Sequence, residues 1–62
     1  MKRYKEKELK RNKKENYRIL EIETYDNISG YQNYFMVTDY NKNIIKKYIT
    51  WNLIDKKYTQ KA

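Results

Sequence analysis

The chain has 62 residues and a formal net charge of +7, and it contains no Cys and no His. This length allows one small domain, whose core is too thin to be stable without help from a disulfide, a metal or a partner. Disulfides and the common soft metal ligands are excluded, so we expect no metal and no cofactor. A partner is the remaining source of stabilisation.

The composition indicates an AT-rich source genome and a cytoplasmic location. Lys, Asn, Ile and Tyr, which have AT-rich codons, supply 34 of the 62 residues. A low-GC bacterium, its phage or a plasmid fits this bias. No apolar run approaches the ~18 residues of a membrane span, and no apolar segment follows the basic N-terminus as in a secretory signal. We expect a protein of the bacterial cytoplasm that has no membrane partner.

Residues 1–16 predict a basic arm. Their only apolar side chains are Met1, Tyr4 and Leu9, too few for the stripe that anchors a helix. One favourable i,i+4 pair, Glu6 with Lys10, adds only about 0.2–0.5 kcal/mol. We expect a frayed short helix or a disordered arm that ends at Asn16.

The segment Tyr17 to Asp26 predicts the first strand, because Tyr, Ile and Thr favour pleated structure. Its alternation is imperfect, since Ile19 lies in one phase and Leu20 and Ile22 in the other. Either a bulge shifts the register or both faces are partly covered. Glu21 and Glu23 share the phase of Ile19. Because charged side chains face solvent, this indicates that Leu20 and Ile22 point inward.

A turn over residues 26–30 follows, because it holds the only Gly and Ser and two Asx residues. A hairpin comes next, with strands over 34–40 and 44–53 joined by a three-residue link at 41–43. This link pairs Tyr40 with Ile44 and Met36 with Tyr48. A two-residue link would place Met36 opposite Lys47 and mix apolar with charged side chains. The three-residue link is therefore preferred.

Alternation along this hairpin predicts two apolar faces. One presents Phe35, Val37, Ile45, Ile49, Trp51 and Leu53, and the other presents Tyr34, Met36, Tyr40, Ile44, Tyr48 and Lys46. Residues 42–55 also show helical spacing, but their β-branched and aromatic content favours a strand. Residues 56–62 are expected to be a polar tail, as a short helix or disordered. The predicted fold is mainly β (α+β if 42–55 is helical): a three-stranded antiparallel meander over 17–55 behind a basic arm.

Catalysis has few residues to work with. Without His or Cys, and with one Ser in a turn, the usual nucleophile–base pairs cannot form. Glu21 and Glu23 share a strand face, as glycosidase carboxylates do, but alternating glutamates are far commoner on solvated strands. The single glycine excludes a glycine-rich phosphate loop. We expect a protein that is not an enzyme.

Nucleic-acid binding is the preferred function. Residues 1–18 carry a net charge of +6 and residues 46–62 carry +4, and such cations bind phosphates by releasing counterions. A tyrosine face with Lys46 can also stack on bases. Codon bias explains the lysines about equally well, and no motif of a known nucleic-acid-binding module is present. The candidate residues are Lys2, Arg3, Lys5, Lys10, Arg11, Lys13, Lys14, Arg18, Lys46 and Lys47, joined by Lys56 and Lys57, with Tyr34, Tyr40 and Tyr48 as stacking residues.

Binding to a protein is the alternative. A sheet with two apolar faces leaves one uncovered, and this face is expected to pack on a second copy, giving a homodimer, or on a host protein. Trp51 and Met36 are the candidate anchors. Small chains from AT-rich phages often inhibit host or defence proteins, as anti-CRISPR proteins do. The alternative function is therefore inhibition of such a protein by a phage- or plasmid-type chain.

Overall fold

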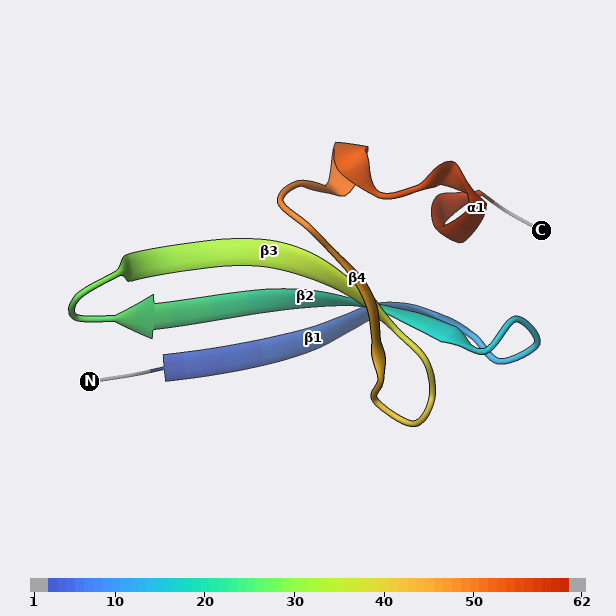
Figure 1. Cartoon of the computed structure of the whole chain (residues 1–62), viewed down its shortest axis with the longest axis horizontal. Helices are drawn as coiled ribbons and strands as arrows, with labels where there is room; N and C mark the ends of the chain where they lie inside the picture. The colour runs from blue at the N-terminus through green and yellow to red at the C-terminus, as the bar shows by residue number, and fades with distance from the viewer. Residues whose placement is uncertain (1–2, 61–62) are drawn as a thin grey trace.

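The computed structural model describes residues 3–60 as one antiparallel sheet followed by a short C-terminal segment (Figure 1). The strand order β1-β2-β3-β4 is a meander, which confirms the mainly-β class. The molecule is elongated, with extents of 40 × 24 × 15 Å. The elements are β1 (Arg3–Asn12), β2 (Tyr17–Asp26), β3 (Gly30–Thr38), β4 (Ile44–Tyr48), the 3-10 turn η1 (Trp51–Leu53) and the one-turn helix α1 (Lys56–Thr59).

The predicted basic arm is wrong, because residues 3–12 form a full edge strand. β1 pairs with β2 from Arg3 opposite Tyr25 to Asn12 opposite Tyr17. The sheet therefore has four strands where three were expected. β2 is an apolar strand that pairs with β3 along one edge. The N–H and C=O groups along its other edge would stay without hydrogen bonds unless a second strand paired with them. An edge strand needs only one partner and tolerates many charges, which is why this polar segment is a strand without an apolar stripe.

A β-bulge at Leu9 interrupts β1. Glu8 lies opposite Leu20 and Lys10 lies opposite Ile19, so Leu9 has no partner in the register. Since side chains alternate along a strand, the extra residue exchanges the faces of everything that follows it. Lys10 consequently shares a face with Lys7, which an unbroken strand would not allow.

β2 has the predicted bounds, and the turn after it is also confirmed. The Ile28 amide donates to Asp26 Oδ1 at 2.7 Å, and Gly30 has a φ of +74°, a conformation that glycine adopts without strain. No bulge interrupts β2 against β3. Both faces of β2 are covered, since Ile19, Leu20 and Ile22 are all buried. The expectation that Leu20 and Ile22 point inward is confirmed, and so is the alternative that both faces of this strand are covered.

The predicted register of the last hairpin is off by one residue. Phe35 lies opposite Tyr48 and Met36 lies opposite Lys47, and a bulge at Ile45 leads into a longer connection. That connection is organised by Asp39, which accepts hydrogen bonds from the Asn41 and Asn43 amides at 2.8 and 2.9 Å. The strand also ends at Tyr48 instead of continuing to residue 53. Asx hydrogen bonding thus replaces the short link expected at 41–43.

The slip moves two side chains to the other face, as a one-residue change must. Tyr48 and Lys46 now lie with the Phe35 and Val37 side, and not with Tyr34. We call the two sides face A and face B. Face A carries Tyr17, Ile19, Phe35, Val37 and Tyr48, and face B carries Leu20, Ile22, Tyr34, Met36 and Lys47.

Each face has its own small core. On face A the C-terminal segment folds back over the sheet (Figure 1), and its Ile54 is buried with Ile19 and Val37. The rings of Tyr58 and Tyr17 meet edge to face at 4.9 Å between centroids. On face B, Leu20, Ile22 and Met36 form a second buried cluster with Tyr34 against it. The segment expected to be a polar tail therefore helps to bury face A.

We predict that Asp39→Asn lowers the Tm at pH 7, because a neutral amide replaces a charged acceptor. Hydrogen bonds from Asn43 lower the pKa of this carboxyl below its ordinary 3.8. The carboxylate therefore stabilises the fold above pH 3.8, and this contribution disappears as pH falls through the lowered pKa. The Tm difference from the native chain should shrink in that range.

Asn41→Ala is the matched control, since this side chain makes no hydrogen bond within residues 3–60 and its loss should leave the Tm nearly unchanged. Equal Tm values for the native chain and Asp39→Asn at pH 7 would contradict this account of the connection.

Candidate nucleic-acid interface

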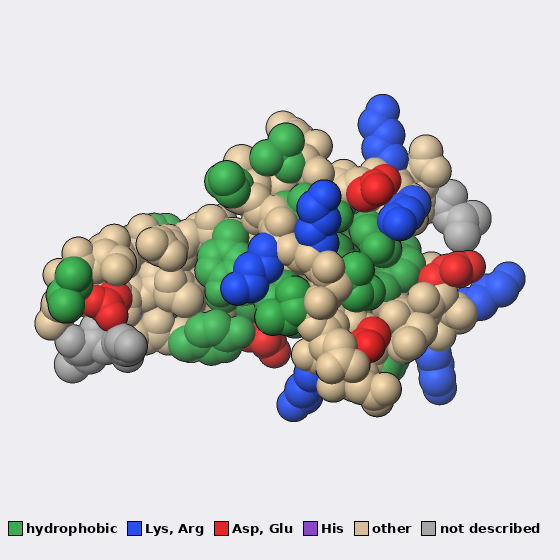
Figure 2. All heavy atoms as spheres, viewed as in Figure 1, with side chains coloured by type: hydrophobic (Ala, Val, Ile, Leu, Met, Phe, Trp, Pro, Cys, Tyr) green, Lys and Arg blue, Asp and Glu red, His purple; other side chains and the backbone are tan. Residues whose placement is uncertain are grey.

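The charge of the molecule is concentrated at one end of its long axis. The cross-strand row of Lys7, Glu21, Phe35 and Tyr48 divides the sheet. We call residues 8–20 and 36–60 the basic half; it carries ten Lys and Arg against four Asp and Glu. The distal half, residues 3–7 and 21–35, carries three against four. Figure 2 shows the Lys and Arg side chains of this view over the basic half, and none over the β2–β3 turn.

Most of the predicted phosphate-binding residues lie in the basic half. Hairpin pairing brings the two basic ends of the sequence together there, which their separation in the chain does not reveal. Arg3 and Lys5 lie in the distal half, and Lys2 falls outside the described residues. The basic half holds Lys10, Arg11, Lys13, Lys14, Arg18, Lys46, Lys47, Lys56 and Lys57.

Several of these cations are already engaged. Arg11 Nη2 lies 2.8 Å from Glu8 Oε2, and this hydrogen bond lowers the pKa of Glu8. Arg18 lies 3.8 Å from the same carboxylate. Lys10 Nζ donates to the Tyr58 and Gln60 carbonyl oxygens at 2.8 and 3.1 Å. Lys10 therefore fastens the C-terminal segment to the sheet, a structural role that the sequence does not reveal.

The cations at the β1–β2 turn are more available. Lys13 and Lys14 are exposed and form no ion pair among residues 3–60. The turn is held by Asn12, whose Oδ1 accepts from the Glu15 amide at 2.9 Å, and by Asn16, which has a φ of +57°. Asn16 Oδ1 also accepts from the Tyr40 amide at 3.2 Å. A turn held by side-chain hydrogen bonds thus presents two exposed ammonium groups.

The predicted tyrosine platform is not assembled. Tyr34 lies on face B, whereas Tyr48 is buried on face A and Tyr40 follows the end of β3. A cation already stands over each ring: Lys47 over Tyr34, Lys46 over Tyr48 and Arg18 over Tyr40, at 5.8, 5.3 and 5.7 Å from the centroid. These cation–π contacts hold the cations at the surface but leave less ring area for a base.

The proposed partner-binding anchors are also separated. Met36 is buried beneath face B and presents almost no surface. Trp51 remains 42% exposed, and its ring packs edge to face on Phe35 at 5.8 Å. Of this pair, only Trp51 is placed to touch another molecule.

Sequence reasoning missed an exposed aromatic pair in the distal half. Tyr25 and Tyr31 lie directly opposite each other on β2 and β3 and are 44% and 62% exposed. Arg3 lies opposite Tyr25 on β1, so the three form one row across face A. A signal for this pair was available, because the two tyrosines flank the predicted turn symmetrically and any tight hairpin places them together.

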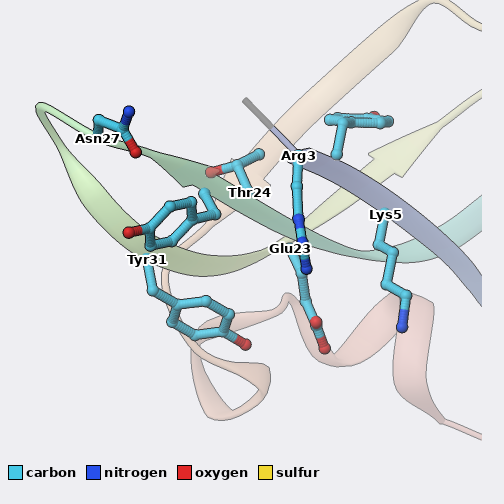
Figure 3. A pocket seen from close by; sticks show the side chains of 8 residues that line it. Arg3, Lys5, Glu23, Thr24, Asn27 and Tyr31 are labelled. Carbon is cyan, nitrogen blue, oxygen red and sulfur yellow. The ribbon is translucent and has the colours of Figure 1, made fainter. Parts of the chain in front are cut away.

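A surface groove of about 820 Å³ surrounds this row (Figure 3). In the figure the Arg3, Lys5 and Glu23 side chains extend to the same side of the ribbon. Two cations and one carboxylate therefore border an aromatic surface. The groove is lined by Arg3, Tyr4, Lys5, Glu23, Thr24, Tyr25, Asn27 and Tyr31.

Tyr4, at the edge of the groove, is tied to its own strand. Its hydroxyl donates to Glu6 Oε1 at 3.1 Å. Desolvation and this bond raise the pKa of the Tyr4 phenol, so it stays protonated at neutral pH.

The two glutamates once considered for catalysis lie on face A opposite lysines, Glu21 facing Lys7 and Glu23 facing Lys5. Asn33 Nδ2 donates to Glu21 Oε2 at 3.2 Å. Within residues 3–60 no group of three or more acidic, His or Cys side chains is placed to hold a metal ion. None of the helices in that range is long and apolar enough to cross a membrane.

Comparisons with protein-family models, curated proteins and solved structures find no match for this chain.

We predict that Lys10→Met destabilises the fold by about 1.5–3 kcal/mol, because it removes two charge-assisted hydrogen bonds to the C-terminal segment, one of them part-buried. Amide hydrogen exchange should accelerate at Tyr58 and Gln60 more than in β2. Lys13→Met makes the same change at an exposed lysine of the β1–β2 turn that forms no ion pair within residues 3–60. It should leave both the stability and the amide exchange rates near those of the native chain. Equal effects of the two variants would show that Lys10 does not fasten this segment.

Proposed function

We propose that the chain is a non-catalytic module that binds nucleic acid through the basic half. The observation that supports this most is the separation of charge: a net +6 lies in one half of a sheet whose other half is slightly negative. Codon bias raises the number of lysines, but it gives no reason for them to gather at one end. A concentrated cationic surface attracts phosphates and releases their counterions.

The exposed lysines of the basic half are suited to contacts with the phosphate backbone. Lys13 and Lys14 project from the tip of the β1–β2 hairpin, and Lys56 and Lys57 lie on the neighbouring C-terminal segment, which Lys10 joins to β1. Flexible lysines at the tip of this hairpin would contact phosphates without reading sequence.

We predict that affinity for a labelled oligonucleotide falls steeply with salt. On a single strand each phosphate contact adds about −0.7 to the slope of log K against log salt concentration. Replacing Lys13 and Lys14 together by Gln should flatten the slope by about 1.4 if both contact phosphates. Fluorescence anisotropy at several salt concentrations measures this change.

The control is Gln32→Glu, which lowers the net charge at an exposed distal position on face B. If the basic half carries binding, the control should leave the slope unchanged. A salt-independent titration, or equal loss per unit of charge in both halves, would overturn the proposed site.

A second candidate function, binding and inhibition of a host protein, is favoured by a different surface. Five large apolar side chains within residues 44–53 are exposed, among them Ile49 at 75% and Leu53 at 61%. They lie in β4 or directly after it, and the outer edge of β4 has no strand partner in the described sheet. Exposed apolar side chains beside an open strand edge are typical of protein interfaces. We call this set the apolar row: Ile44, Ile45, Ile49, Trp51 and Leu53.

We predict, for this second function, that Ile49→Asp abolishes capture of a stoichiometric protein from nuclease-treated host lysate. Ile28→Asp is the matched control, since Ile28 is 95% exposed at the distal tip, away from the apolar row. The apolar row could instead pack on a second copy of the chain. Light scattering of the purified chain tests this by measuring whether its mass in solution is that of a dimer. No specific capture by the native chain would rule out the host partner.

A further inference from the structure

The distal end of face A has an uncovered aromatic surface. The C-terminal segment covers Tyr17, Ile19 and Tyr48 at the other end of this face but leaves the row of Tyr25 and Tyr31 open. Folding normally hides aromatic area, since each ring buried contributes strongly to stability. Here two tyrosines that lie directly opposite each other in the register remain 44% and 62% exposed, and they border a groove with Arg3 and Lys5.

We propose that Tyr25 and Tyr31 form a stacking site for an unpaired base, so that the nucleic acid bound is single-stranded. This inference rests on the proposed function and names its ligand class. Aromatic side chains in single-strand binding proteins stack on bases regardless of sequence. Paired bases in a duplex hide their faces in the stack, whereas an unpaired base can leave it. The ligand therefore needs a single-stranded segment.

The charges around the pair fit a nucleotide. Arg3 lies opposite Tyr25, and Lys5 is two residues along the same face of β1. Either cation can neutralise a phosphate next to a stacked base. Glu23, opposite Lys5, offers a carboxylate that can accept a hydrogen bond from an N–H group on a base edge. Figure 3 shows these three side chains extending to the same side.

Three tyrosines are poorer candidates for stacking, because a lysine or arginine already stands over the ring of each: Tyr34, Tyr40 and Tyr48. Lys47 and Arg18 stand over Tyr34 and Tyr40, and Tyr48 is buried. No cation stands over the Tyr25 or Tyr31 ring among the contacts found within residues 3–60. Their faces are therefore more accessible for stacking than those of Tyr34, Tyr40 and Tyr48.

The cross-strand pair also stabilises its hairpin, so the test must separate stacking from folding. The full chain is titrated with an oligothymidylate of about 15 nucleotides and with an abasic oligonucleotide of equal length. The native chain should bind the oligothymidylate about tenfold more tightly. Changing both tyrosines to Thr keeps β-forming residues and should abolish that preference. Changing both to Phe should retain it, and Ile28→Thr serves as the surface control.

Nuclear magnetic resonance supplies a readout that needs no variant. Stacking should move the ring protons of Tyr25 and Tyr31 upfield when the oligothymidylate is added to the native chain. Suppose that both oligonucleotides bind equally and cause no ring shifts, and that the double variant Lys13→Gln, Lys14→Gln binds both more weakly. The stacking site is then wrong, and the proposed function of the basic half stands. If neither oligonucleotide binds, the proposed function fails and the stacking site fails with it.

Discussion

The fold depends on a constraint borne by β2, which buries apolar side chains on both faces of a single sheet. Ile19 on face A and Ile22 on face B are both fully buried. A chain this short cannot build a full layer over each face. The C-terminal segment covers half of face A, held by the contact of Tyr58 with Tyr17 and by Lys10. Face B is closed by long side chains such as Tyr34.

The sequence patterns correctly predicted those features of the fold that depend on interactions between residues close together in the chain. β2 and the turn after it were correct because their β-branched residues, Asp26 and Gly30 act within a few positions. β1 was missed because its strand conformation comes from pairing with β2, and nothing in a Lys- and Glu-rich segment indicates that pairing. The last hairpin failed by one residue, because hydrogen bonds to Asp39 and the bulge at Ile45 set its register.

The candidate interface could be predicted only in part. The sequence shows two basic ends, but their meeting in one half depends on the order of strands in the meander. The predicted grouping of Tyr34 with Tyr48 failed with the register. Tyr25 and Tyr31, in contrast, could have been paired from the turn alone. β1 and β4 are the two open edges of the described sheet, and their lysines disfavour edge-to-edge pairing.

The bulge at Leu9 decides which of two neighbouring cations lies on each face of the sheet. Because of this single unpaired residue, Lys10 lies on face A beneath the C-terminal segment, and Arg11 lies on face B beside Glu8. Without a bulge, Leu9 would take the place opposite Ile19, and Lys10 would move opposite Arg18 on face B. Loss of Leu9 alone would leave Lys10 opposite Ile19 on face A, so this position accepts a one-residue deletion that would reverse the faces elsewhere in the strand.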